Sequence, residues 1–236
     1  SGLILNWLIR HNYPGELGIH FAGAGVGIIV ISLLVGGMVQ FSTSWDQQWL
    51  WCGLVAAVLS VWAWRWMPQP DARPITVSGD ALVDQPPSRL FMLILLVAYF
   101  CAGYGYVISA TFIVDIVEGV PGLEGLGASV FLIIGVAVMP AAIVWDRIAR
   151  RVGYLKALML AYSVQVLGIV LPVFTDSYLG ALMSALLYGG TFIGCVSLVL
   201  TMAGRFYPTR PAKLMGKMTL SYGVAQIVAP ALTGML

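Results

Sequence analysis

The sequence predicts an all-α integral membrane protein. Of its residues, 60% are hydrophobic and 9% are charged, whereas a soluble domain has about 45–50% and about 25%. Seven uncharged stretches are near or above the ~18 residues that read as a membrane-spanning helix. All twelve Lys and Arg residues fall on alternate connections between these stretches. The predicted spans are residues 17–45, 47–64, 90–114, 125–145, 157–175, 177–204 and 218–236.

Both ends of the chain lie in apolar segments. Residues 1–9 lack an initiator Met and are predicted to be the last two turns of an earlier helix. The run that ends at Leu236 has no charged flank. We therefore expect a fragment of a longer protein, cut inside two helices.

The charges also predict an orientation. Connections rich in Lys and Arg are cytoplasmic by the positive-inside rule, and no base lies on the opposite connections. Those carry only acids, namely Asp46, Asp115, Glu118, Glu124 and Asp176. We expect the basic loops inside and the acids outside, in a multi-pass protein of the bacterial inner membrane. The bases next to membrane ends do not imply nucleic-acid binding.

The one long connection is predicted to be a cytoplasmic linker. Residues 68–88 contain five prolines and little apolar surface, so they cannot fold alone. They divide the chain into residues 1–67, the linker 68–88, and residues 89–236.

A weak similarity between two segments of the chain suggests an internal repeat. The run Arg10-His11-Asn12-Tyr13-Pro14 resembles Arg205-Phe206-Tyr207-Pro208, with six predicted spans between the two. A six-span repeat keeps its orientation, as in transporters with two parallel halves.

One basic connection contains a candidate conformational latch. It reads Asp146-Arg147-Ile148-Ala149-Arg150-Arg151. An acid at a helix end with bases one, four and five residues later can form a charge-assisted network that holds one helix against another. Ordinary positive-inside charge would also place Arg147, Arg150 and Arg151 here, and both interpretations stay open.

This connection resembles the Gly-x-x-x-Asp-Arg-x-Gly-Arg-Arg loop of the major facilitator superfamily, with Ala142 and Ala149 in place of the two glycines. Residues 20–27, 105–112, 187–194 and 222–230 resemble its YbfB/YjiJ branch, and the resemblance covers essentially the whole chain. It implies a partial major facilitator fold, with about seven transmembrane helices of an expected twelve. Residues 1–67 would then be the end of the N-terminal bundle, from a stub of helix 4 to helix 6. Residues 89–236 would be helices 7 to 11.

Glycine pairs and polar stripes mark candidate contact surfaces. Gly23 with Gly27, and Gly190 with Gly194, place two glycines on one helix face, where backbones can approach closely. Polar side chains inside spans are costly unless they face protein or a water-filled cavity. Three stripes could line such a cavity: Tyr104, Thr111 and Asp115; Ser184, Tyr188 and Thr191; Tyr222 and Gln226. Hydrogen bonding between helices is the alternative role for each of them.

His20 and Asp115 are the two titratable groups near apolar runs that could carry a coupling proton. Histidine can exchange protons near neutral pH. Both residues are close to predicted span ends, so an interfacial position would also explain them.

These features predict a secondary transporter that moves a small organic solute through the lipid bilayer by alternating access. Family analogy favours proton-coupled efflux, and we expect a monomer. A seven-span receptor or sensor is the alternative, because seven complete spans are visible. No motif for a metal, a nucleophile or a nucleotide is present, so we expect neither an enzyme nor a cofactor.

Overall fold

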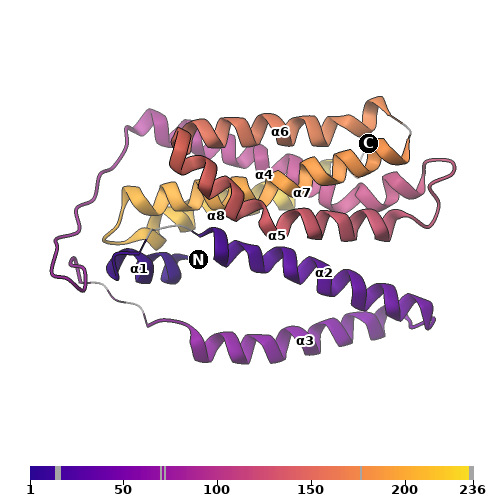
Figure 1. Cartoon of the computed structure of the whole chain (residues 1–236), viewed down its shortest axis with the longest axis horizontal. Coiled ribbons are helices and arrows are strands. Elements are labelled where there is room, and N and C mark those ends of the chain that lie inside the picture. The colour runs from indigo at the N-terminus through magenta and orange to yellow at the C-terminus, as the bar shows by residue number, and fades with distance from the viewer. Residues whose placement is uncertain (14–16, 70, 72, 176, 234–236) are drawn as a thin grey trace.

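The computed structural model describes residues 1–13, 17–69, 71, 73–175 and 177–233. Within these ranges the secondary-structure elements are helices, apart from an isolated antiparallel bridge between Ile75 and Ala81. Figure 1 shows the arrangement of the helices. They are α1 (Gly2–Arg10), α2 (Gly18–Gln40), α3 (Trp45–Trp66), α4 (Arg89–Glu118), α5 (Gly127–Val152), α6 (Tyr154–Phe174), α7 (Tyr178–Phe206) and α8 (Pro211–Thr233).

Helices α4 to α8 form one bundle around α7. In the most apolar stretch of α7, 78% of the residues are buried, and α5, α6 and α8 all pack against this helix. Small buried residues such as Ser184, Gly189 and Gly194 are spread around its circumference and let neighbours approach from several sides. A helix that is buried all round is the expected centre of a bundle.

Helices α2 and α3 form a separate arm beside the bundle (Figure 1). Helix α2 packs along α5, whereas α3 contacts only α2. No residue of α3 is buried, and its surface is apolar and rich in Trp. Such a surface is suited to lipid or to further protein, with Trp at the membrane boundaries.

Six helices, α2 to α7, are long and apolar enough to cross a membrane. They correspond to the first six predicted spans. The seventh predicted span, residues 218–236, falls on α8, which begins earlier, at Pro211, and is described as far as Thr233. Asp176, predicted to lie outside the membrane, is not among the described residues. Neither is Pro14, which belongs to the suggested internal repeat.

The basic connections are shorter than the sequence suggested. Arg147, Arg150 and Arg151 belong to the last turns of α5, and only Gly153 separates α5 from α6. Its φ of +91° reverses the chain without a side chain to oppose that conformation. Lys213 and Lys217 lie in α8. The helices continue past their apolar stretches because long basic side chains can remain hydrated at the membrane boundary.

The linker 68–88 has no helix in its described residues up to its last residue, Ser88, which caps α4. Hydrogen bonds attach it at two places. The backbone N–H of Val77 donates to the carbonyl of Arg10 at 2.8 Å, and that of Gln85 donates to the carbonyl of Phe206 at 2.9 Å. The carboxylate of Asp84 accepts hydrogen bonds from Thr209. The linker therefore contacts both α1 and the connection between α7 and α8.

Close approach of α2 and α5 depends on glycine. A Cβ built on Gly25 would overlap the backbone of Met139, and one built on Gly135 would lie 2.8 Å from the side chain of Ile28. The predicted packing glycines Gly23 and Gly27 meet no described atom within 4 Å. The contact face of α2 thus carries Gly25, because the helix is rotated relative to the face that the sequence suggested.

We predict that Gly25→Ala destabilises the protein by about 1–3 kcal/mol, the usual cost of adding a methylene to a filled contact. Gly23→Ala is the matched control, since its methyl group would enter open space. Thermal unfolding of the purified protein in detergent compares the two. Equal melting temperatures for the two variants would contradict this packing.

Candidate functional site

Five aromatic side chains from three helices form a cluster inside the bundle. They are Tyr99 and Tyr106 of α4, Tyr188 and Phe192 of α7, and Tyr222 of α8. Ring centroids lie 4.7 Å apart for Tyr99 and Tyr222, 4.8 Å for Tyr106 and Phe192, and 5.4 Å for Tyr188 and Phe192. These separations are typical of favourable aromatic pairs.

Space for the cluster comes from Gly103. A Cβ at this position would lie 3.0 Å from the ring of Tyr222. Gly103 also lies on the same face of α4 as Tyr99 and Tyr106, at helical spacings of four and three residues. The aromatic ring of α8 can therefore pack directly onto the backbone of α4.

Several hydroxyl groups of the predicted stripes form hydrogen bonds with backbone. Ser184 donates to the carbonyl of Gly168 in α6 at 2.7 Å, and Tyr188 donates to the carbonyl of Tyr106 in α4 at 3.0 Å. Thr191 donates to the carbonyl of Leu187 within α7, at 2.7 Å. Ser184 and Tyr188 thus join helices, the alternative role that the sequence left open.

The side chains of the remaining stripe residues form no hydrogen bond with another described residue. Tyr104 and Gln226 are half-buried, whereas Thr111 and Asp115 are exposed. The stripe of Tyr104, Thr111 and Asp115 lies on a different face of α4 from the cluster. The spacing of Tyr99, Gly103 and Tyr106 is the pattern that would have identified the contributing face.

Asp146 is the buried centre of the predicted latch loop, with a relative exposure of 3%. Its carboxylate accepts a hydrogen bond from the backbone N–H of Gly18 at 2.7 Å, and one from the hydroxyl of Ser197 at 3.5 Å. Gly18 is the first residue of α2 and Ser197 belongs to α7. One side chain of α5 therefore joins three helices.

The position of Asp146 also suits the charge of the helix end it meets. The first turn of α2 has free N–H groups and a positive partial charge, which a carboxylate stabilises. A Cβ at Gly18 would overlap the carboxylate. The neighbouring Trp145 donates from Nε1 to the carbonyl of Gly190 at 2.7 Å, and its ring lies against Gly194. Gly194 is thus a packing glycine, while Gly190 meets no described atom within 4 Å.

The three arginines of the loop are exposed, and two of them lie beside this centre. Arg147 and Arg150 line a cavity of about 560 Å³ between α1, α2 and α5, together with Asp146 and His20. His20 is exposed on the first turn of α2, with its ring 5.1 Å from that of Phe21. The fold therefore brings one candidate proton carrier next to the latch, and Asp115 lies elsewhere on α4.

We predict that Asp146→Asn, which removes the charge and keeps the shape, lowers the free energy of unfolding by about 1–3 kcal/mol. Hydrogen exchange at the first amides of α2 should become faster. Lys156→Gln is the control, because it alters an exposed charge near the start of α6, outside the predicted latch. Unchanged exchange in Asp146→Asn would show that the carboxylate does not hold α2.

Comparison with known proteins identifies the family. A family model described as an uncharacterised MFS-type transporter YbfB matches residues 1–236. Searches of curated proteins and of solved structures found no match. The match, with the apolar helices, shows a multi-pass membrane protein with a partial major facilitator fold, and it does not favour a seven-span receptor. The chain therefore belongs to the YbfB-type family of major facilitator superfamily transporters.

Proposed function

We propose that the protein is a secondary active transporter that exports a small organic solute in exchange for protons, by alternating access of two helix bundles. The arm of α2 and α3 would belong to the N-terminal bundle, and α4 to α8 to the C-terminal bundle. The basic loops and the linker would face the cytoplasm of a bacterium, with the bundles in its inner membrane, as the charge distribution favours.

The observation that carries this proposal is the contact of Asp146 with the first turn of α2. In alternating access, the contact between bundles has to form in one state and break in another. Asp146 joins α5 and α7 to α2 through two hydrogen bonds. These hydrogen bonds can open at modest cost, because water can replace a backbone N–H and a hydroxyl group as partners of the carboxylate. Asp146 would act as the latch, with Arg147, Arg150 and Arg151 around it.

The contact between α2 and α5 through glycine residues supports the same proposal. Gly25 and Gly135 bring the two helices together, and the side chains of Ile28 and Ile29 pack against Gly135. Helices that meet through small residues can shift along each other with few changes of rotamer. The proposed latch at Gly18 lies at one end of this contact, so its release would permit α2 to move relative to α5.

The aromatic cluster indicates the class of solute. The half-buried Tyr106 and Tyr222 provide ring faces, and half-buried Gln226 lies one turn of α8 beyond Tyr222. Such a surface suits a neutral or amphipathic solute with an aromatic or other flat apolar part. Tyr222 and Gln226 would contact the solute directly. Tyr188, Ser184 and Thr191 would position the helices, and Tyr104 and Thr111 remain candidates on the neighbouring face of α4.

We predict that Tyr222→Leu raises the KM for solute about tenfold, the factor that corresponds to losing one favourable aromatic contact. Tyr178→Leu, at the start of α7 and outside the cluster, is the matched control. Uptake of a panel of neutral and amphipathic aromatic compounds into sealed vesicles measures the effect. Equal KM values for the two variants would contradict the proposed solute site.

Proton coupling is tested with His20→Gln and Asp115→Asn. The variant that removes the coupling group should abolish the solute-dependent pH change in sealed vesicles. It should retain exchange of labelled for unlabelled solute, because exchange needs no net proton movement. Full coupling in both variants would exclude these two residues. Absence of any pH change in the unmodified protein, across the whole panel, would argue against proton coupling itself.

A further inference from the structure

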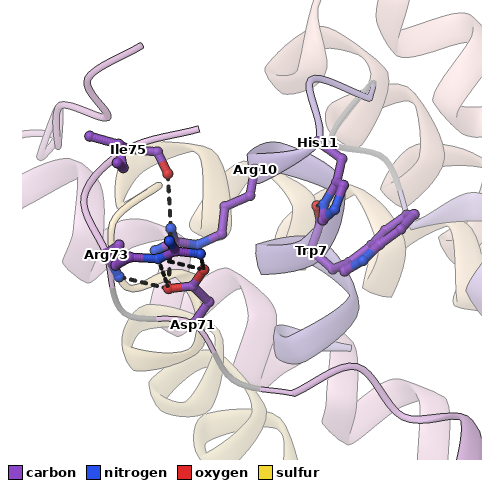
Figure 2. A network of polar contacts seen from close by, with 6 residues as sticks. All are labelled: Trp7, Arg10, His11, Asp71, Arg73 and Ile75. Carbon is purple, nitrogen blue, oxygen red and sulfur yellow. Dashed lines mark hydrogen bonds and ion pairs between the residues drawn. The ribbon is translucent and has the colours of Figure 1, made fainter. Parts of the chain in front are cut away.

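A second cavity lies between the end of α1 and the linker, away from the aromatic cluster and from the latch. Its volume is about 640 Å³, and it is lined by residues of α1, by His11 and by described residues of the linker between 68 and 79. Figure 2 shows the polar network at this place, where the side chains of Arg10, Asp71 and Arg73 meet. We call this cavity the linker site.

Positive charge exceeds negative charge in the linker site. Two guanidinium groups share one carboxylate, and Asp71 is the only acid among the described lining residues. Hydrogen bonds from Arg73, with a smaller contribution from the charge of Arg10, hold the pKa of Asp71 well below its usual range. The carboxylate is therefore ionised at neutral pH, and one positive charge remains uncompensated.

Arg73 donates several hydrogen bonds to the carboxylate of Asp71. Its Nη2 donates to Oδ2 at 2.8 Å, its Nε lies 3.2 Å from both oxygens, and its backbone N–H donates to Oδ1 at 3.0 Å. The nearest contact of Arg10 with the same carboxylate is an ion pair at 3.6 Å. Asp71 thus forms its hydrogen bonds with Arg73 and leaves Arg10 with electrostatic attraction alone.

Arg10 is left with donors that have no acceptor. Its residue exposure is 3%, and its Nη1 donates to the carbonyl of Ile75 at 2.9 Å. Its Nε and Nη2 are buried and have no hydrogen-bond partner among the described residues. A buried guanidinium is costly unless acceptors satisfy its donors and an anion balances its charge. An anion with several acceptor oxygens would satisfy these donors and balance this charge.

We propose that the linker site binds a phosphate group, either from the headgroup of an anionic phospholipid or from a soluble phosphate. Arginine pairs bind phosphate through parallel hydrogen bonds, and the cavity has the volume of a small-molecule site. One wall is formed by Trp7 and His11, whose rings stack at 4.3 Å. At the cytoplasmic boundary of the membrane, where the proposed orientation places this cavity, phospholipid headgroups and soluble phosphates are both available.

Binding would stabilise the docked linker. Residues 74–82 turn back on themselves beside α1, where Val77 donates to the carbonyl of Arg10 and Asn12 donates to Ser78 at 2.7 Å. A phosphate held by Arg10 and Arg73 would bridge α1 and the linker at the same place. The ligand would therefore control how firmly the linker is attached to α1.

The test is hydrogen exchange of residues 75–82 in the purified protein. Sodium phosphate is compared with sodium chloride at equal ionic strength, and phosphatidylglycerol with phosphatidylcholine in mixed micelles. We expect saturable slowing of exchange with sodium phosphate, with phosphatidylglycerol, or with both. A response to sodium phosphate would identify a soluble ligand. A response to phosphatidylglycerol alone would identify a lipid headgroup. Equal slowing by chloride would show screening only and would overturn the proposal.

Two variants change the surplus charge in opposite directions. Arg73→Gln removes it and should weaken binding about tenfold, the factor for one charge-assisted hydrogen bond. Asp71→Asn increases it and should tighten binding by a similar factor. Arg65→Gln, an exposed arginine of α3 outside the site, is the control. Affinities that do not change in opposite directions would overturn the proposal, since a purely structural role predicts no gain in Asp71→Asn.

Discussion

The contact between α2 and α5 is the interaction on which the rest of the arrangement depends. Gly25 and Gly135 permit the two backbones to approach, and the carboxylate of Asp146 meets the first N–H of α2 at the end of this contact. The arm of α2 and α3 has little other contact with the bundle. A buried carboxylate at a helix N-terminus is stabilised by hydrogen bonds and by the partial positive charge there.

Small residues and interhelical hydrogen bonds hold the bundle of α4 to α8 together. In lipid, apolar surface gives no driving force between helices, so small residues and interhelical hydrogen bonds determine which helices associate. Helix α7 meets both conditions, since Ser184 and Tyr188 bond the backbones of α6 and α4. The aromatic cluster then fills the space between α4, α7 and α8. The hydroxyl groups of Ser184 and Tyr188 therefore hold neighbouring helices in place.

The linker joins the arm of α2 and α3 to the bundle of α4 to α8. Its composition excludes an independent core, and it is ordered by hydrogen bonds to α1 and to the connection between α7 and α8. These bonds involve backbone groups and side chains that are half-buried or exposed. A change in the relative position of the helices can break them without large loss of packing. The surplus charge of Arg10 and Arg73 lies where the linker meets α1.

The sequence alone determined the fold class, the positions of the apolar helices, the linker and Asp146 as a candidate latch. These features depend on local hydrophobicity and charge, because a bilayer imposes helix length and favours bases on one side. The rotation of each helix was decided only by tertiary packing. Gly25 took the contact that Gly23 and Gly27 were predicted to make, and Tyr106 joined the cluster in place of Tyr104. A helix in lipid is apolar on every face, so periodicity cannot identify its contact face, and close packing against neighbouring helices decides it.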